Sequence, residues 1–238
     1  MIDVGFFLPL YKDEVRTPMI NLAMRLISTL KAAGVESDSI WLVRRNGDFE
    51  FPLEFGYLPG LLQETFTNPE RFSNSLPEKW KRLDAAQYLA FFGQVEEALR
   101  EYEDLMRLED APFLLYEGAI LKFKYGDLDA GIKYLRGAAI KDRDYSRGFL
   151  LQALYFWRKG ELAATESILR AGRDLFPDDE MMSIGLARVL TEQALSEREA
   201  DPLGAKSRVD EALSLAIPEE IRKEITHVWG RGVPPGEK

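Results

Sequence analysis

Four stretches of eight residues share one pattern: AQYLAFFG (86–93), AILKFKYG (119–126), ALYFWRKG (153–160) and ARVLTEQA (187–194). Each begins with an alanine, and the first three end with a glycine, whereas the fourth ends with Ala194. The leading alanines are spaced 33, 34 and 34 residues apart. A helical repeat of this length cannot bury its apolar side alone and must stack on its neighbours, so the pattern predicts a solenoid over residues 79–217.

Each copy of the repeat is expected to contain two helices joined by a turn. In the first copy, apolar residues recur three or four positions apart on both sides of Gly93, which is typical of two helices separated by a breaker. In the fourth copy the second helix begins six residues late, so Thr191 to Gly204 contains either a longer first helix or a protruding loop. We interpret the small residues as packing positions: Ala86, Ala119, Ala153, Ala187, Ala98, Gly131, Thr165, Ala138 and Gly172.

These residues resemble the tetratricopeptide repeat (TPR) family, over residues 79–217. The matching features are the small residue in each first helix, the glycine in the turn and, in the third copy, the terminating Pro177. The resemblance implies a mainly α fold, a TPR-like solenoid of about four helical hairpins. It also implies a protein-binding role with no cofactor and no catalytic residue. A related helical-hairpin repeat is the alternative.

The segments that flank the repeats are expected to differ from them. Residues 1–78 are predicted to form a small mixed α/β unit docked on the solenoid, with a strand from Ile2 to Leu10, a helix from Pro18 to Ala33 and a hairpin around Asn46-Gly47. A further short helix is expected near Leu58 to Phe66. Residues 218–230 are predicted to form a capping helix, and 231–238 a disordered tail.

Composition limits the possible functions. The chain has 40 acidic and 31 basic residues, for a net charge of −9, and no segment is basic, which argues against a nucleic-acid surface. It contains no cysteine, which excludes disulfides and thiolate metal sites and fits a cytoplasmic location. The longest apolar run, Phe6 to Tyr11, is too short for membrane insertion. The oligomeric state stays open.

The resemblance also implies which side chains face the concave inner surface, because it places one face of each first helix there. The expected partner-binding groove is lined by nine residues: Phe91, Tyr116, Ile120, Phe123, Arg147, Leu154, Trp157, Arg158 and Arg188. An apolar stripe of this size is expected to be buried by another segment of the chain or by a partner. Residues 1–78 could fold back over it, or a helix or peptide segment of another protein could bind in it, with arginines meeting its acidic groups. The two are not exclusive, because a groove half filled by residues 1–78 would leave Trp157, Arg158 and Arg188 free for a partner.

Two other function classes are weighed against this adaptor or chaperone-like role. The order strand, helix, strand in residues 1–43 loosely resembles the start of a glycosyltransferase, but the loop from Pro9 to Thr17 lacks the glycine that a phosphate-binding turn needs. His227 has no acid or nucleophile at catalytic spacing. The turn Arg44 to Gly47 looks like the wing of a nucleic-acid-associated regulator, but only one helix precedes it.

Overall fold

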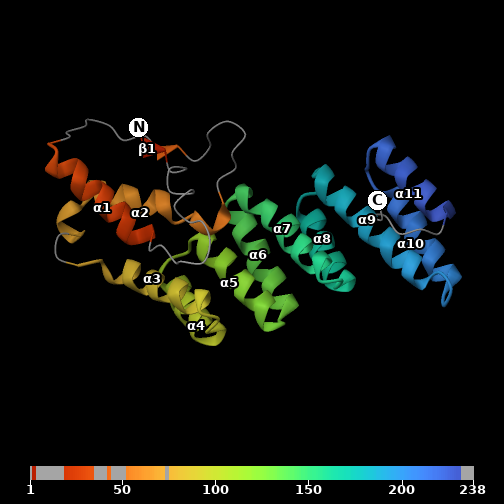
Figure 1. Cartoon of the computed structure of the whole chain (residues 1–238), viewed down its shortest axis with the longest axis horizontal. Helices are drawn as coiled ribbons and strands as arrows, with labels where there is room; N and C mark the ends of the chain where they lie inside the picture. Colours follow the sequence, from red (N-terminus) through yellow and green to blue (C-terminus); the bar gives the residue numbers. More distant parts are fainter. Residues whose placement is uncertain (1, 4–18, 35–41, 44–51, 73–74, 232–238) are drawn as a thin grey trace. The chain divides into compact units, whose positions relative to one another are not determined.

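The computed structural model describes residues 2–3, 19–34, 42–43, 52–72 and 75–231, and this part of the chain is mainly α-helical (Figure 1). The chain divides into two compact units, Met1–Tyr134 and Leu135–Lys238, called unit 1 and unit 2 below. This division falls inside a helix. The expected boundary between residues 78 and 79 stays a prediction, although a helix begins there, at Glu78.

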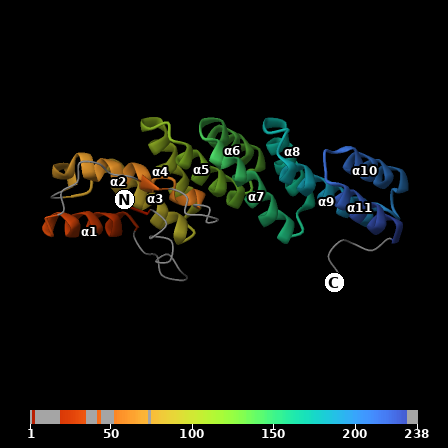
Figure 2. The same cartoon turned by 90° about the horizontal axis from the view of Figure 1, so that it is seen from above.

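Unit 1 begins with short elements. Strands β1 (Ile2–Asp3) and β2 (Leu42–Val43) form one parallel pair, and helix α1 (Met19–Ala32) contacts α2 (Leu58–Thr67) (Figure 2). The helices from Met19 and near Leu58 agree with the sequence patterns. Two pairs of strand residues do not support a mixed α/β unit, and the rest of the expected strand and hairpin, at 4–10 and 44–51, lies outside the described residues.

Two single-turn helices continue the N-terminal region. η2 (Leu53–Phe55) contacts the helix α5 of the repeats, and η3 (Pro69–Phe72) contacts α2. The remaining helices of unit 1 follow in order: α3 (Glu78–Phe91), α4 (Val95–Leu108), α5 (Pro112–Tyr125) and α6 (Leu128–Lys141), whose last seven residues belong to unit 2.

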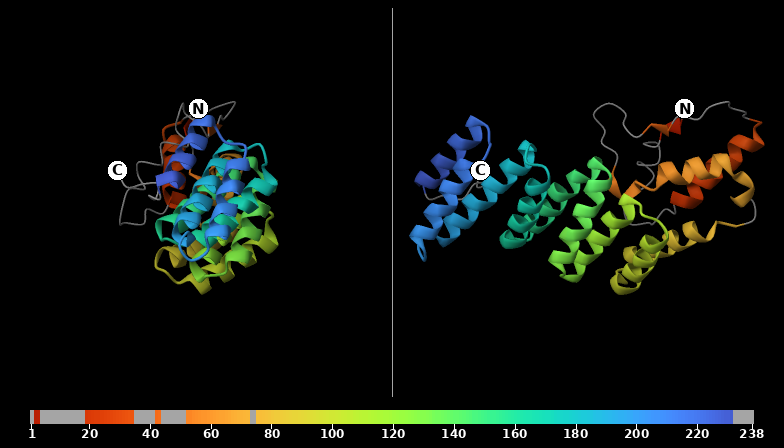
Figure 3. Two further views of the ribbon diagram at one scale, coloured as in Figure 1. Left: turned by 90° about the vertical axis from the view of Figure 1, so that its right-hand side faces the viewer. Right: turned by 180° about the vertical axis from the view of Figure 1, so that it is seen from behind.

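Unit 2 continues the series of neighbouring helical pairs. After η4 (Arg143–Ser146) its helices are α7 (Arg147–Arg158), α8 (Leu162–Leu175), α9 (Glu180–Glu197), α10 (Pro202–Ser214) and α11 (Glu219–Arg231). Each helix from α7 to α11 packs on the next one, and α9 also contacts α7 and α11 (Figure 3). Helical hairpins stacked in sequence order are what the repeat pattern predicts.

The repeat residues have the structural roles that their spacing indicates. Gly93, Gly126 and Gly160 follow α3, α5 and α7 with φ of 74°, 85° and 75°, the left-handed conformation that glycine adopts without strain. The four leading alanines are at most 3% exposed. They are Ala86, Ala119, Ala153 and Ala187. Buried alanines leave room for close contact between helices, and this determines how each hairpin packs.

Glycines on the second helices allow still closer contacts. A Cβ on Gly131 would lie 2.4 Å from two ring carbons of Phe123, so α6 lies directly on that ring. A Cβ on Gly172 would lie 2.5 Å from the sulfur of Met182 and 2.9 Å from Cγ of Phe149, which come from the helices on either side of α8. The interpretation of Gly131 and Gly172 as packing positions is confirmed.

The fourth copy departs from the others through a longer first helix, one of the two expected possibilities. α9 has 18 residues, compared with 14 in α3 and α5 and 12 in α7, the first helices of the other three copies. Asp201 then caps α10, because its side chain accepts a hydrogen bond of 3.0 Å from the backbone N–H of Gly204. α11 forms where the capping helix is predicted and packs on α9 and α10. The predicted disordered tail, apart from Arg231, lies outside the described residues.

Candidate functional site

The nine predicted groove residues belong to both units, and each unit is described by itself. Unit 1 contains four of them: Phe91, Tyr116, Ile120 and Phe123. Unit 2 contains the other five: Arg147, Leu154, Trp157, Arg158 and Arg188. The two groups differ in what surrounds them.

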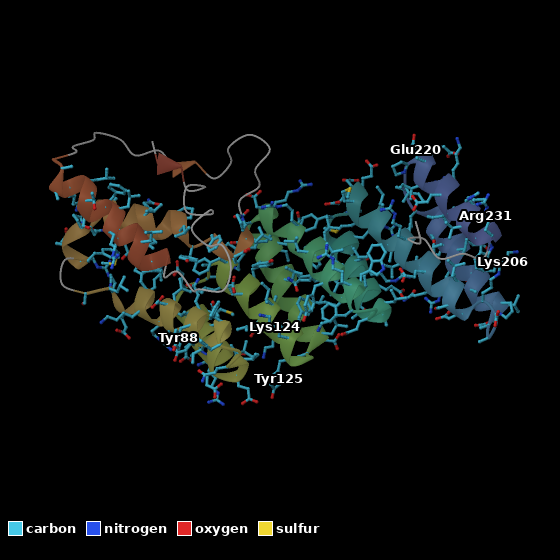
Figure 4. All side chains as sticks on the ribbon, in the orientation of Figure 1. Tyr88, Lys124, Tyr125, Lys206, Glu220 and Arg231 are labelled. Carbon is cyan, nitrogen blue, oxygen red and sulfur yellow. The ribbon has the colours of Figure 1, made fainter. Side chains whose placement is uncertain are left out.

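In unit 1 most of the predicted groove residues are covered. Tyr116 and Phe123 are 2% and 4% exposed, and Ile120 is partly exposed. Phe91 is 46% exposed, and its ring contacts that of Phe92 edge-on at 5.1 Å. The exposed Tyr88 lies in the same helix and is labelled in Figure 4.

The N-terminal region supplies part of this cover. The ring of Tyr57, between η2 and α2, lies 6.0 Å from the ring of Phe113 on α5. On α3, Trp80 is 1% exposed and its Nε1 donates a 2.9 Å hydrogen bond to Oε2 of Glu64 on α2. Residues before position 78 therefore fold back over the apolar faces of α3 and α5. Within unit 1 this corresponds to the self-covered alternative.

The contact between η2 and α5 contains two acidic side chains. Glu117 on α5 is partly exposed as a residue, but its Oε1 is shielded from solvent and has no hydrogen-bond partner in the described part of the chain. Burial, and then the nearby Glu54 carboxylate, raise the pKa of Glu117 to about 8, while Lys124 opposes the shift. Burial also raises the pKa of Glu54, and a backbone hydrogen bond opposes this. Glu117 was not predicted as a site residue. Its place as an acidic residue within the largely apolar stretch 113–123 could have indicated a buried carboxyl group.

In unit 2 three of the five predicted residues are held by neighbours. Nε1 of Trp157 donates a 2.6 Å hydrogen bond to Oε2 of Glu192 on α9. Arg188 of α9 pairs with Glu224 of α11 at 3.1 Å. Nε of Arg147 donates to the backbone oxygen of Asp144 at 3.3 Å. These three side chains link neighbouring elements of the unit, although Nε of Arg188 is buried without a hydrogen-bond partner among the described residues.

The other two predicted residues lie on an open surface. Leu154 is 40% exposed, and Arg158 is exposed and has no ion-pair partner within the described residues. Leu151, Tyr155 and Arg158 lie on the same side of α7 as Leu154, because they follow at spacings of three and four. Leu151 and Tyr155 are 49% and 37% exposed, and Nζ of Lys159 lies 4.4 Å from the centre of the Tyr155 ring.

Met181 lies near the start of α9, at the repeat position that Arg147 has in α7, and is 60% exposed. We call these five residues the α7–α9 face: Leu151, Leu154, Tyr155, Arg158 and Met181. Three of them, Leu151, Tyr155 and Met181, were not among the nine predicted residues. The TPR pattern assigns Met181 to the inner surface, whereas Leu151 and Tyr155 each lie one position beyond a residue that the pattern assigns to that surface.

Other kinds of site find little support in the structure. Among the residues that the structure describes, no group of three or more His, Cys, Asp or Glu side chains could hold a metal ion. None of the described helices is both long enough and apolar enough to cross a membrane. No protein-family model matches the sequence, and no curated protein matches it either.

Proposed function

We propose that the chain is a non-enzymatic adaptor built as a TPR-like solenoid, and that unit 2 binds a helical segment of another protein through the α7–α9 face. The observation that carries the proposal is the open apolar side of α7, where Leu151, Leu154 and Tyr155 are each more than a third exposed. The absence of cysteine supports a reducing compartment such as the cytoplasm.

The chemistry of the face indicates what the segment carries. Leu151 and Leu154 are 49% and 40% exposed, so a partner that buries one of them gains roughly half of the about 1.5–3 kcal/mol of a full leucine burial. Apolar residues at helical spacing therefore suit the face. Arg158 lies at the end of the apolar row without an ion-pair partner among the described residues, and a carboxylate on the partner would provide one. The expected partner is an amphipathic helix with acidic residues beside its apolar stripe.

The test uses defined peptides and the full-length chain. Three labelled 18-residue peptides would be compared by fluorescence anisotropy: a leucine stripe flanked by glutamates, the same stripe flanked by lysines, and a glutamate-rich peptide with the stripe scrambled. The proposal expects the first to bind most tightly. Leu154→Glu should weaken its binding at least about tenfold, because it removes apolar contact and adds a like charge. Arg158→Glu should reverse the preference between the first two peptides.

A matched control is available in the same unit. Leu203 on α10 is 83% exposed and lies outside the α7–α9 face, so Leu203→Glu makes the same chemical change elsewhere. It should leave peptide binding unchanged. The proposal is refuted if the scrambled peptide binds as tightly as the first, or if Leu203→Glu and Leu154→Glu have equal effects.

A further inference from the structure

A segment of unit 1 covers an apolar surface without being part of the repeats. We call it the cover, and it consists of η2 and α2, residues 53–67. Leu53, Phe55 and Tyr57 are 4%, 4% and 2% exposed, and η2 packs directly on α5. Beneath it lies Phe113, which is 6% exposed and whose ring centre is 6.0 Å from that of Tyr57. Tyr116, three residues further along α5, is 2% exposed. If the cover moved away, an aromatic surface on α5 would be open to a partner.

The contact between the cover and α5 contains carboxyl groups from both sides. Glu54 belongs to η2 and Glu117 to α5, and the charge of Glu54 contributes to the raised pKa of Glu117. The other charged groups on and against α5 include Lys124 and an ion pair in which Nζ of Lys122 lies 3.1 Å from Oε1 of Glu103 on α4. At the end of α5, Oε1 of Glu96 on α4 accepts a 2.9 Å hydrogen bond from the hydroxyl of Tyr125. Lys124 is exposed, and its charge only partly offsets the rise in the pKa of Glu117 that burial causes. Ionisation therefore places two like charges in a contact with little water.

We propose that protonated Glu54 and Glu117 hold the cover closed on α5, and that ionisation of the two groups releases it and exposes the surface around Phe113 and Tyr116. The unpartnered Oε1 of Glu117 is the geometric reason, because a neutral carboxyl is tolerated there at a lower cost than a carboxylate, which needs water or a cation. The cover therefore switches between a closed and a released arrangement, and proton binding favours the closed one.

The size of the effect follows from the two protonation equilibria. In the closed state Glu117 has a pKa of about 8, and in the released state, in water, the ordinary value of 4.5 applies. Because the closed state binds the proton more tightly, raising the pH favours release. Between pH 6 and pH 9 the ratio of released to closed molecules should rise by up to about 90-fold from Glu117 alone. Glu54 acts in the same direction.

Hydrogen–deuterium exchange of the full chain tests the proposal. Exchange of the amides in 53–67 would be measured from pH 6 to pH 9 and divided by the rate of an unstructured peptide at each pH. Protection of the cover should fall steeply with pH in the wild type. The fall should be smaller in Glu117→Gln and absent in Glu54→Gln with Glu117→Gln, since neutral amides cannot ionise. Protection of 186–194 in α9 should not change.

Two comparisons keep the proposal falsifiable. Glu199→Gln removes an exposed carboxylate of unit 2 and should leave the profile of the cover as in the wild type. Equal pH profiles in the wild type and in the double variant would overturn the proposal, because the two carboxyls would then have no part in release. Parallel loss of protection in 186–194 would also overturn it, because it indicates unfolding of the whole chain.

Discussion

The close contact at Gly131 leads to a quantitative prediction, because the substitution Gly131→Ala sets two effects of similar size against each other. Alanine is favoured over glycine inside a helix by about 1 kcal/mol. The added Cβ, however, would lie 2.4 Å from Cδ1 and Cε1 of Phe123 and 2.9 Å from Cζ. A ring that is 4% exposed has no free space to move into, and overpacking of this kind costs about 1–3 kcal/mol.

The net result is a loss of about 0–2 kcal/mol in the free energy of unfolding of unit 1. Gly60 provides a matched control, because it lies in helix α2 of the same unit and a Cβ there would meet nothing within 4 Å. Gly60→Ala should therefore stabilise by up to about 1 kcal/mol. The difference between the two variants, about 1–3 kcal/mol, isolates the packing contribution.

Urea unfolding followed by far-ultraviolet circular dichroism measures both variants against the wild type. A shared slope with shifted midpoints is expected, because neither substitution alters the surface exposed on unfolding. If Gly131→Ala stabilised the protein as much as Gly60→Ala, helix α6 would not lie against the Phe123 ring, and the close packing inferred from the small residues would be wrong.

Three further predictions concern other parts of the molecule. Asp201→Ala removes the cap of α10 and should lower the free energy of unfolding of unit 2 by about 1 kcal/mol, measured by urea unfolding. Asp201→Asn should keep most of the wild-type stability, because asparagine also caps helices. Trp157→Phe removes the hydrogen bond to Glu192 and should cost about 1.5 kcal/mol, because the acceptor is charged but only partly buried; no loss in the same assay would contradict this. Glu117→Gln should raise the stability of unit 1 at pH 7 by about 2–3 kcal/mol, and the gain should vanish near pH 4. The reason is that the pKa of Glu117 is higher in the folded chain than in the unfolded chain, so wild-type stability falls as pH rises from about 4.5 to 8; thermal melts across this range measure it.

The repeat region could be predicted from the sequence because its signals are local and recur. Gly93, Gly126 and Gly160 mark the turns, and each has the positive φ that glycine tolerates. The leading alanines mark the closest contacts, and all four are buried. A pattern repeated about every 34 residues is also hard to produce by chance, so the helical hairpins were specified without any knowledge of neighbouring elements.

The surfaces were harder to predict, because burial depends on which distant segment folds over a helix. Tyr116 and Leu154 were both predicted to line the inner surface, yet one is 2% exposed and the other 40%. On α5 the cover packs against this face through Phe113, and the sequence of residues 53–67 indicates only a short helix. Side-chain partners such as Glu192 for Trp157 and Glu224 for Arg188 lie 35 and 36 residues away, beyond any local pattern.

The extra length of α9 shows how this chain can change size without losing its stacking. Four added residues turn a helix by about 400°, which returns its buried side to within about 40° of the original direction. One or two added residues would instead rotate alanines such as Ala187 away from their neighbours. Insertions and deletions inside these helices should therefore be tolerated in steps of three or four, and an insertion scan along α9 would show survival at those lengths alone.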